Sequence, residues 1–400
     1  MWRRLAPTWL ALHAIACGSS TDGAAPGSAQ ASSTAAARGA VLEAAENQSS
    51  ASTSSTAKAA ADPVVAIAAT QLEVGSTPGD AGRDPTLEPP LFSVDLGPFD
   101  IDRAPYPNEA GRPPMKGVTR EKAASLCKER GRRLCTEAEW ELACKGPEGS
   151  LYAGRAGWDD ACSRDPSSCA SSFGVVAMGA YREWTSSDVA AVGDVKAGAA
   201  VRGAPSSASP LDRRCARRSS VEPSTSSNDL TFRCCGGAPN DVALPAPKRG
   251  ATFERAELSA SALEEMFGVI PQLSKLKDLK YFDAEAAART VTSKADAGAD
   301  PKGYILTTTP LSWRPVPGEE LVVVTGLANE DSFIVALYRL PDGRHRVASS
   351  LVLKRDRGPV ILAYDRSVDT RLEWSTCWQC PGESGRITYR DDRRVVITQE

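Results

Sequence analysis

The sequence has few histidines, no long apolar run and no excess of charge of one sign. Only two of the 400 residues are histidines, and His13 lies in the N-terminal segment, which leaves His345 for the rest of the chain. So small a number excludes His-rich metal sites and argues against a Ser-His-Asp hydrolase. Lys and Arg number 47 against 50 Asp and Glu, a formal charge of -3. We therefore expect no nucleic acid partner, because phosphate recognition needs a basic surface.

An apolar stretch near the N-terminus, residues 5–16, predicts an export signal rather than a membrane span. It follows Arg3 and Arg4. It is too short to span a bilayer, because a membrane-spanning helix needs about 20 apolar residues. No other stretch of the chain reaches that length, so we expect no transmembrane helix.

The apolar stretch ends in Ala-Ile-Ala-Cys-Gly, residues 14–18, which resembles a bacterial lipobox. In a lipobox the cysteine, here Cys17, is lipidated and becomes the mature N-terminus, so residues 1–17 are predicted to be a lipoprotein signal peptide. Ala14 departs from the usual Leu, and an ordinary cleaved signal peptide is the alternative. Gly18 is not the Asp that marks inner-membrane retention. The resemblance therefore implies an outer membrane lipoprotein that faces the periplasm or the cell surface and contacts the membrane through its N-terminal lipid.

The 11 cysteines point to an oxidising compartment. If Cys17 is lipidated, an even number remains, which permits complete pairing. We therefore predict that the others form disulfides. They are Cys127, Cys135, Cys144, Cys162, Cys169, Cys215, Cys234, Cys235, Cys377 and Cys380.

Composition divides the chain into regions beyond the signal peptide. Residues 18–90 are rich in Ala, Ser and Thr with almost no aromatics, which predicts a disordered tether, because such a segment buries too little apolar surface. Residues 91–238 hold eight of the cysteines and are expected to fold as a domain. A Pro-rich joint follows at residues 239–250. Residues 251–295 have helical spacing, and residues 300–400 have strand signals.

Two short helices are predicted in the cysteine-rich region. Thr119 can cap a helix through Lys128, because its side chain accepts a free backbone N–H at the helix start. Thr136 and Glu139 have the spacing of a capping box, which predicts a second helix. The apolar residues expected to share one face are Ala124 and Cys127 on the first helix and Trp140, Ala143 and Cys144 on the second.

Residues 131–146, GRRLCTEAEWELACKG, resemble the GRRLPTEAEWEYACRG signature of the formylglycine-generating enzyme (sulfatase-modifying factor) family. Further segments resemble family motifs in the same order. They are residues 99–102 at the opening strand, 178–185 at the GNVWEWT segment, 201–203 at the RVxRGG strand, 213–218 at RCAxR and 232–234 at GFRC. The resemblance implies an α+β fold of the C-type-lectin-like kind, with little regular structure, over residues 97–236. Family members include oxidases, sulfoxide synthases and non-catalytic lipoproteins.

The resemblance also implies part of the disulfide pattern. The family's structural pairs correspond here to Cys127 with Cys234 and Cys144 with Cys215. A short local loop between Cys162 and Cys169 would then leave Cys135 with Cys235. The resemblance does not fix the connectivity of these last four cysteines.

The residues that carry the family's chemistry are missing at the matched positions. The family oxidase binds copper through two cysteine thiolates spaced five apart, and counting back from Cys215 places Pro205 and Pro210 there. Ala180 stands where the family has an asparagine near a calcium site. The sulfoxide synthases need three histidines, which this chain cannot supply. We therefore predict no catalytic residue, no metal and no cofactor, with copper or calcium only if the family site is rebuilt.

Two other kinds of site stay open from the residues alone. A relocated metal or redox centre would use cysteines outside the two family pairs, although disulfides explain those cysteines more simply. These are Cys135, Cys162, Cys169 and Cys235. A basic cluster can bind an acidic ligand such as a sulfated or carboxylated glycan or a lipopolysaccharide phosphate, although a solvated strand edge is the plainer interpretation. The cluster consists of Arg213, Arg214, Arg217 and Arg218.

The C-terminal region is expected to hold a helical segment and then a β domain. Apolar spacing predicts one helix that contains Leu263 and is interrupted at Pro271, and a second helical stretch from Leu273 to Phe282 and beyond. Eight short strands predict an antiparallel sandwich or barrel-like sheet. The strands are expected at residues 304–309, 321–325, 333–340, 345–353, 360–364, 371–376, 385–389 and 394–398.

Cys377 and Cys380 form a CxxC motif followed by Pro381. A thioredoxin-type redox function needs such a motif at a helix N-terminus, where the helix dipole lowers a thiol pKa. Here the motif lies in a turn between predicted strands, so a local disulfide is the simpler interpretation.

These observations predict an exported, lipid-anchored protein that has lost catalysis and acts as a binding or scaffold module at the cell envelope. Its ligand is expected to be an envelope protein or a glycan. One alternative is an active formylglycine-generating-type oxidase with a rearranged site, which predicts free thiols. The other is a redox module that depends on Cys377 and Cys380.

Overall fold

The computed structural model describes residues 63–400 except residues 193, 206, 248–249, 283–303, 308, 355–358 and 379–380. These residues belong to one compact unit, residues 60–400. None of the helices described is long and apolar enough to cross a membrane. The predicted signal peptide, Cys17 and most of the predicted tether lie outside the described residues.

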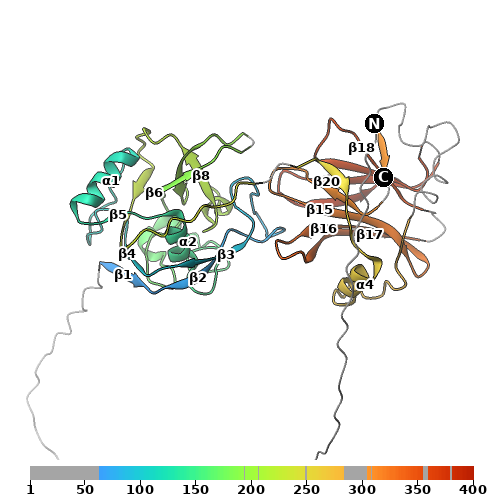
Figure 1. Cartoon of the computed structure of the whole chain (residues 1–400), viewed down its shortest axis with the longest axis horizontal. Helices are drawn as coiled ribbons and strands as arrows, with labels where there is room; N and C mark the ends of the chain where they lie inside the picture. Colours follow the sequence, from blue (N-terminus) through green and yellow to red (C-terminus); the bar gives the residue numbers. More distant parts are fainter. Residues whose placement is uncertain are drawn as a thin grey trace, which may run out of the picture. The chain divides into compact units, whose positions relative to one another are not determined.

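Three sheets form the first part of the described chain (Figure 1). One sheet has the strand order β1-β4-β10-β5, a second has the order β8-β7-β6-β9, and β2 pairs with β3. All strand pairs are antiparallel except β6 and β9, which run parallel. The strands are β1 (Val64–Ile67), β2 (Thr70–Val74), β3 (Phe92–Leu96), β4 (Phe99–Asp102), β5 (Arg133–Leu134), β6 (Arg182–Val189), β7 (Gly198–Arg202), β8 (Arg218–Val221), β9 (Leu230–Phe232) and β10 (Cys234–Gly236).

The two predicted helices of this part are confirmed. Helix α1 (Arg120–Glu129) begins where the Thr119 side chain accepts the Lys122 N–H, and α2 (Glu137–Lys145) begins at the predicted capping box. The packed face of α1 differs from the prediction, because Ala123 is buried with Cys127 while Ala124 is exposed. Short helical turns complete this part: α3 (Ala161–Arg164), η1 (Pro166–Ser168) and η2 (Pro210–Arg213).

The prediction of a disordered tether up to residue 90 is wrong for its last part, since β1 and β2 lie there. Val65 and Ile67 of β1 are buried where the strand pairs with β4. Leu72 and Val74 of β2 are buried where it pairs with β3. This alternation of apolar and polar residues is what a half-buried strand requires, and it stands out from the Ala- and Ser-rich sequence that precedes it.

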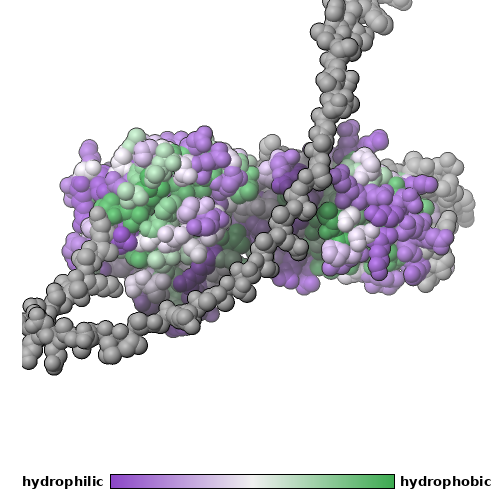
Figure 2. Space-filling view, turned by 90° about the horizontal axis from the view of Figure 1, so that it is seen from below, coloured by the Kyte–Doolittle hydropathy of each residue, from purple (hydrophilic) through white to green (hydrophobic). Residues whose placement is uncertain are grey.

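Two buried clusters hold this part together. One joins β1–β4 to α2 and includes Trp140 and Met178, and the other joins α1 to β6, β7 and β9 around Trp184. Hydrophobic residues reach the surface over β1–β3, shown in green in Figure 2, where Phe92 and Val94 are half-buried against the first cluster.

The second part is a β-sandwich. One sheet has the order β11-β14-β15-β16-β17 with β12 paired to β15, and the other has the order β13-β18-β19-β20-β21. The core between the sheets includes Trp313 and Trp374, both fully buried. The strands are β11 (Phe253–Arg255), β12 (Lys280–Tyr281), β13 (Ile305–Thr307), β14 (Leu311–Trp313), β15 (Leu321–Ala328), β16 (Asp331–Arg339), β17 (His345–Leu353), β18 (Ile361–Tyr364), β19 (Arg371–Ser375), β20 (Ser384–Tyr389) and β21 (Val395–Gln399).

The helical segment is shorter than predicted. Helix α4 (Ala260–Gly268) packs Leu263 and Phe267 on β15 and β16, but the second predicted stretch is a series of turns up to β12. There Leu273 and Leu276 are buried at a three-residue spacing that also fits a helix, yet the chain turns after Pro271. Residues 283–295 of the predicted segment lie outside the described residues.

Candidate functional site

The segment between β7 and Cys215 is where the family resemblance places the thiols of the oxidase. Pro205 lies in the loop after β7, and Pro210 opens η2. Arg213 ends η2, and its guanidinium donates to the Pro205 carbonyl at 3.0 Å and to the Gly179 carbonyl at 3.2 Å. The Cζ atom of Arg213 is 4.7 Å from the ring centroid of Trp158. Arg213 is only 1% exposed, so a buried guanidinium cross-links this segment to the loop before β6.

The side chains at this segment do not fit copper. Proline offers no thiolate, and the nearest cysteine in sequence, Cys215, is fully buried and bonded to Cys144. Ala180, at the position of the calcium-site asparagine, offers no side-chain oxygen. No group of three or more His, Cys, Asp or Glu side chains in the described part of the chain is arranged to hold a metal ion.

Four disulfides use all eight cysteines of the first part. All four pairs agree with the sequence prediction, including Cys135–Cys235 and Cys162–Cys169, which the family resemblance leaves open. They join Cys127 to Cys234, Cys135 to Cys235, Cys144 to Cys215, and Cys162 to Cys169. The adjacent cysteines of β10 thus point to opposite sides of the strand, one toward α1 and one toward the start of α2.

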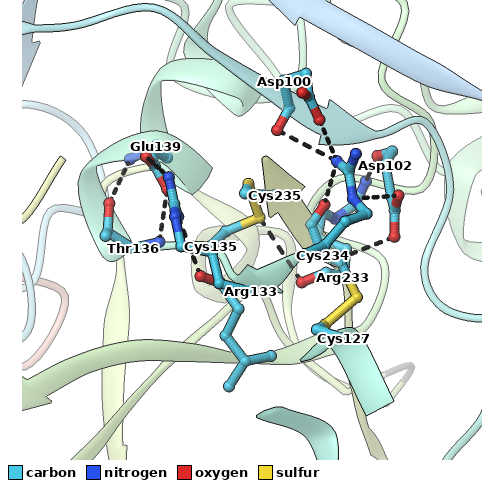
Figure 3. Close-up of a disulfide and its surroundings, with 12 residues drawn as sticks. Asp100, Asp102, Cys127, Arg133, Cys135, Thr136, Glu139, Arg233, Cys234 and Cys235 are labelled. Carbon is cyan, nitrogen blue, oxygen red and sulfur yellow. Dashed lines mark hydrogen bonds and ion pairs between the residues drawn. A yellow bond between two sulfur atoms is a disulfide. The ribbon is translucent and has the colours of Figure 1, made fainter. Parts of the chain in front are cut away.

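Charged side chains enclose the β10 disulfides (Figure 3). Asp102 accepts the Cys234 N–H at 3.0 Å. Burial raises the pKa of the Asp102 carboxyl in spite of the nearby guanidinium groups of Arg132 and Arg233. Arg233 is fully buried and pairs with Glu183 at 2.6 Å. Asp102 and Arg233 thus tie the surroundings of these sulfurs to β4 and β6.

The four arginines of the predicted acidic-ligand cluster bind groups within the chain. Arg213, Arg214 and Arg218 are buried, whereas 22% of the Arg217 side chain is exposed. Three of them pair with carboxylates: Arg214 with Glu88, Arg217 with Asp212, and Arg218 with Glu137. Binding of an acidic ligand by these residues stays a prediction, and their contacts in the structure stabilise the fold.

A buried ionic cluster centred on α2 has no counterpart in the sequence analysis. Arg202 of β7 lies between Glu137 at 3.1 Å and Glu141 at 3.0 Å, and all three residues are at most 1% exposed. Burial alone would raise the pKa of Glu141, but the ammonium of Lys145 and the guanidinium of Arg202 outweigh it and lower the pKa. The helical i,i+4 spacing of Glu141 and Lys145 was the available signal, but the partner on β7 is set by tertiary structure.

The CxxC motif lies between β19 and β20. Cys377 is disulfide-bonded, and its N–H donates to the Ser375 hydroxyl at 3.1 Å, while Cys380 lies outside the described residues. Trp378 is 8% exposed and packs against Tyr304. No helix begins at the described residues on either side of 379–380, whereas a thioredoxin-type thiol needs a helix N-terminus.

A family model agrees with the family resemblance for the first part of the chain. The chain matches none of the curated proteins at a significant level. Similar solved structures include PvdO from Pseudomonas aeruginosa, at 20% identity over 43% of this chain and 93% of that chain with a TM-score of 0.35. Another is Treponema denticola variable protein 1, at 16% identity over 43% of this chain and 94% of that chain with a TM-score of 0.36. Residues 102–237 match the model of the sulfatase-modifying factor enzyme 1-like domain, which confirms that this part of the chain is a domain of that family.

Proposed function

We propose that the chain is an exported, lipid-anchored protein whose sulfatase-modifying-factor-like domain has lost the family reaction and serves as a binding or scaffold module at the cell envelope. The observation that carries this proposal is the presence of Pro205 and Pro210 where the oxidase has its copper-binding thiols. Without a thiolate at either position, the domain has no soft ligand for Cu(I) there.

Two further features support the proposal. The first is that sulfur in this domain is consumed by four disulfides, which leaves no described cysteine of the domain available as a nucleophile. The second is the guanidinium of Arg213, which holds the Pro205 carbonyl and so occupies the segment in which the oxidase keeps a ligand. These contacts stabilise the segment.

Copper titration combined with an oxygen-consumption assay on a cysteine-containing peptide tests the loss of the reaction. We expect no stoichiometric Cu(I) binding and no oxygen uptake above that of the peptide with copper alone, under conditions in which an active family oxidase turns over. Turnover would refute the proposal. Alkylation of the native protein followed by mass spectrometry provides the second readout, because an oxidase with a rearranged site requires unbonded thiols, which would be labelled before reduction.

The envelope location is tested separately through Cys17. Incorporation of a labelled fatty acid and recovery in the outer membrane fraction are expected for the full chain. Cys17→Ser should abolish both. Equal labelling of the wild-type protein and the Cys17→Ser variant would contradict lipidation at Cys17. It would not bear on the proposed loss of catalysis.

A further inference from the structure

A hollow of about 450 Å³ opens beside α1 in the family domain. One wall is the α1 face that carries Arg120, Ala124 and Lys128, and the other is the segment Arg132, Arg133 and Leu134 at β5. Figure 1 shows α1 next to β5 in this part of the molecule. The hollow is distant in sequence from the Pro205 segment, and none of its residues was singled out as a binding residue from the sequence.

The spacing of Arg120, Ala124 and Lys128 along α1 explains the shape of the hollow. Arg120, Ala124 and Lys128 follow one another at four-residue intervals and therefore lie on one face of the helix. Ala124 is the smallest of the three and is exposed, so it leaves space between the two longer side chains. Leu134, which is 3% exposed, provides an apolar residue on the opposite wall.

The charged ends of the two β5 arginines are engaged elsewhere. Arg133 donates to both oxygens of Glu139 at 2.7 Å and to the carbonyls of residues 237 and 238. Arg132 binds Asp100 and donates to the Cys234 carbonyl. Since these guanidinium groups bind partners away from α1, the two side chains offer their aliphatic stems to the hollow. The middle of the hollow is thus mainly apolar.

The two cations on α1 differ in accessibility: Lys128 is exposed, whereas the Arg120 side chain is 18% exposed and has partners that a ligand would have to displace. Lys128 is exposed in the last turn of α1, and within the described residues it has no ion pair. Arg120 pairs with Asp188, whose side chain is 76% exposed, and its other Nη donates to the Ser186 carbonyl. A pair with so exposed a carboxylate is weak in water and readily exchanges for another anion.

We propose that this hollow binds a small amphiphilic carboxylate. The apolar body of the ligand lies over Ala124, Leu134 and the arginine stems, and its carboxylate pairs with Lys128 and takes the place of Asp188 on Arg120. A fully polar anion leaves the apolar walls unused, and a neutral apolar molecule leaves both cations unused, so the combination selects this ligand class. The inference names a ligand class for a domain whose proposed function is binding, but it does not depend on the loss of catalysis.

Calorimetric titration of the full chain with three probes tests the ligand class. The probes are hexanoate, which has both features, hexanol, which has the apolar body alone, and acetate, which has the anion alone. Hexanoate is expected to bind at least tenfold more tightly than either of the others. Equal binding of hexanoate and hexanol, or no binding of hexanoate, would overturn the proposal.

Variants on α1 locate the site. Lys128→Gln should weaken hexanoate binding about tenfold, the size expected for the loss of a charge-assisted hydrogen bond. Ala124→Leu should abolish binding by filling the hollow, and Leu is tolerated at an exposed helical position. Lys122→Gln is the matched control, because Lys122 lies on the same helix, is 57% exposed and does not line the hollow. An equal effect of the two Lys→Gln changes would refute the site. Neither outcome changes the result of the oxygen-consumption assay. The proposed ligand site and the proposed loss of catalysis can therefore fail independently.

Discussion

At the scale of single residues, the proposed loss of the family reaction depends on a few side chains, while others form the fold. Thr136 and Glu139 keep the capping box of the signature, and Arg133 still binds Glu139 through both Nη atoms. Pro205 and Pro210, by contrast, stand where the family resemblance places soft copper ligands, and their side chains cannot bind a metal. The fold-forming residues are recognisable in sequence because they act locally through caps and short spacings.

Removal of the Arg202 charge is expected to destabilise the protein strongly. Arg202→Met leaves Glu137 and Glu141 buried without this partner, and breaking a buried pair in this way costs roughly 3–5 kcal/mol. Urea denaturation followed by tryptophan fluorescence measures the loss. Arg112→Met is the control, because the side chains of Arg112 and Glu109 are about half exposed and water screens their pair, so a much smaller loss of stability is expected. A similar loss in both variants would show that burial of the α2 cluster does not matter.

The capping box at α2 is a second residue-scale device with a measurable contribution. Thr136→Ala removes the acceptor of the Glu139 N–H at a site that is 1% exposed, and we expect a loss of about 2 kcal/mol. Thr119→Ala removes the single exposed cap of α1 and should cost about 1 kcal/mol or less. The melting temperatures of the two variants, measured by thermal unfolding, give the comparison. A larger decrease for Thr119→Ala than for Thr136→Ala would contradict the larger stabilisation expected from the capping box.

At the scale of elements, the sequence predicts those parts whose ends carry local signals. Both helices of the family domain begin at Thr caps, and His345–Leu353 has the bounds of β17. Residues 273–279 form turns and irregular backbone instead of the second predicted helix, because buried leucines three residues apart fit turns as well as helices. β14 is missed because Leu311–Trp313 is too short to show a period, and it forms only because β11 and β15 flank it.

The disulfides should differ in what they contribute, since they close loops of very different length. The sequence separation is 107 for Cys127–Cys234 and 7 for Cys162–Cys169. In the chain-entropy model these loops restrict the unfolded chain by about 5 and about 2 kcal/mol respectively. Replacing each pair by Ala and measuring urea unfolding should therefore show at least twofold greater destabilisation for the long loop. An equal or reversed order would show that native packing, rather than loop closure, sets the contribution.

At the scale of the whole molecule, the structure depends on contacts that no local pattern announces. The family match covers residues 102–237, and the described residues before and after that range contact each other as well. Arg83, which precedes β3, is 1% exposed and lies 2.9 Å from Glu319, which precedes β15, although 236 residues separate them in sequence. The composition around Arg83 predicts a disordered tether, because nothing near it in the chain indicates its partner. Such pairs are found only once the tertiary structure is known.

The environment of Glu319 makes this contact sensitive to pH. Burial raises the pKa of the Glu319 carboxyl to about 7, and this outweighs the opposing effects of Arg83 and Arg393. The phenols of Tyr338 and Tyr389 also face this carboxyl, and burial raises the pKa of both. Water cannot stabilise the charged carboxylate here, so the folded state holds the proton to a higher pH than the unfolded chain does.

The free energy of unfolding should consequently fall as pH rises. The unfolded carboxyl has a pKa near its ordinary value of 4.5, and the folded one has a pKa of about 7. The stabilisation that the protonated Glu319 carboxyl gives the folded state is fully present below the unfolded pKa of 4.5. It is lost as pH rises through the folded pKa of about 7, and the free energy of unfolding falls by at most about 3 kcal/mol. Glu319→Gln should flatten the stability profile between pH 5 and 8. Glu320→Gln should leave this window unchanged, because arginine partners lower the pKa of Glu320 in spite of burial. A wild-type profile that is flat over this range would show that the contact with Arg83 keeps Glu319 ionised, and Arg83 and Glu319 would then form a permanent ion pair rather than a contact with a protonated acid.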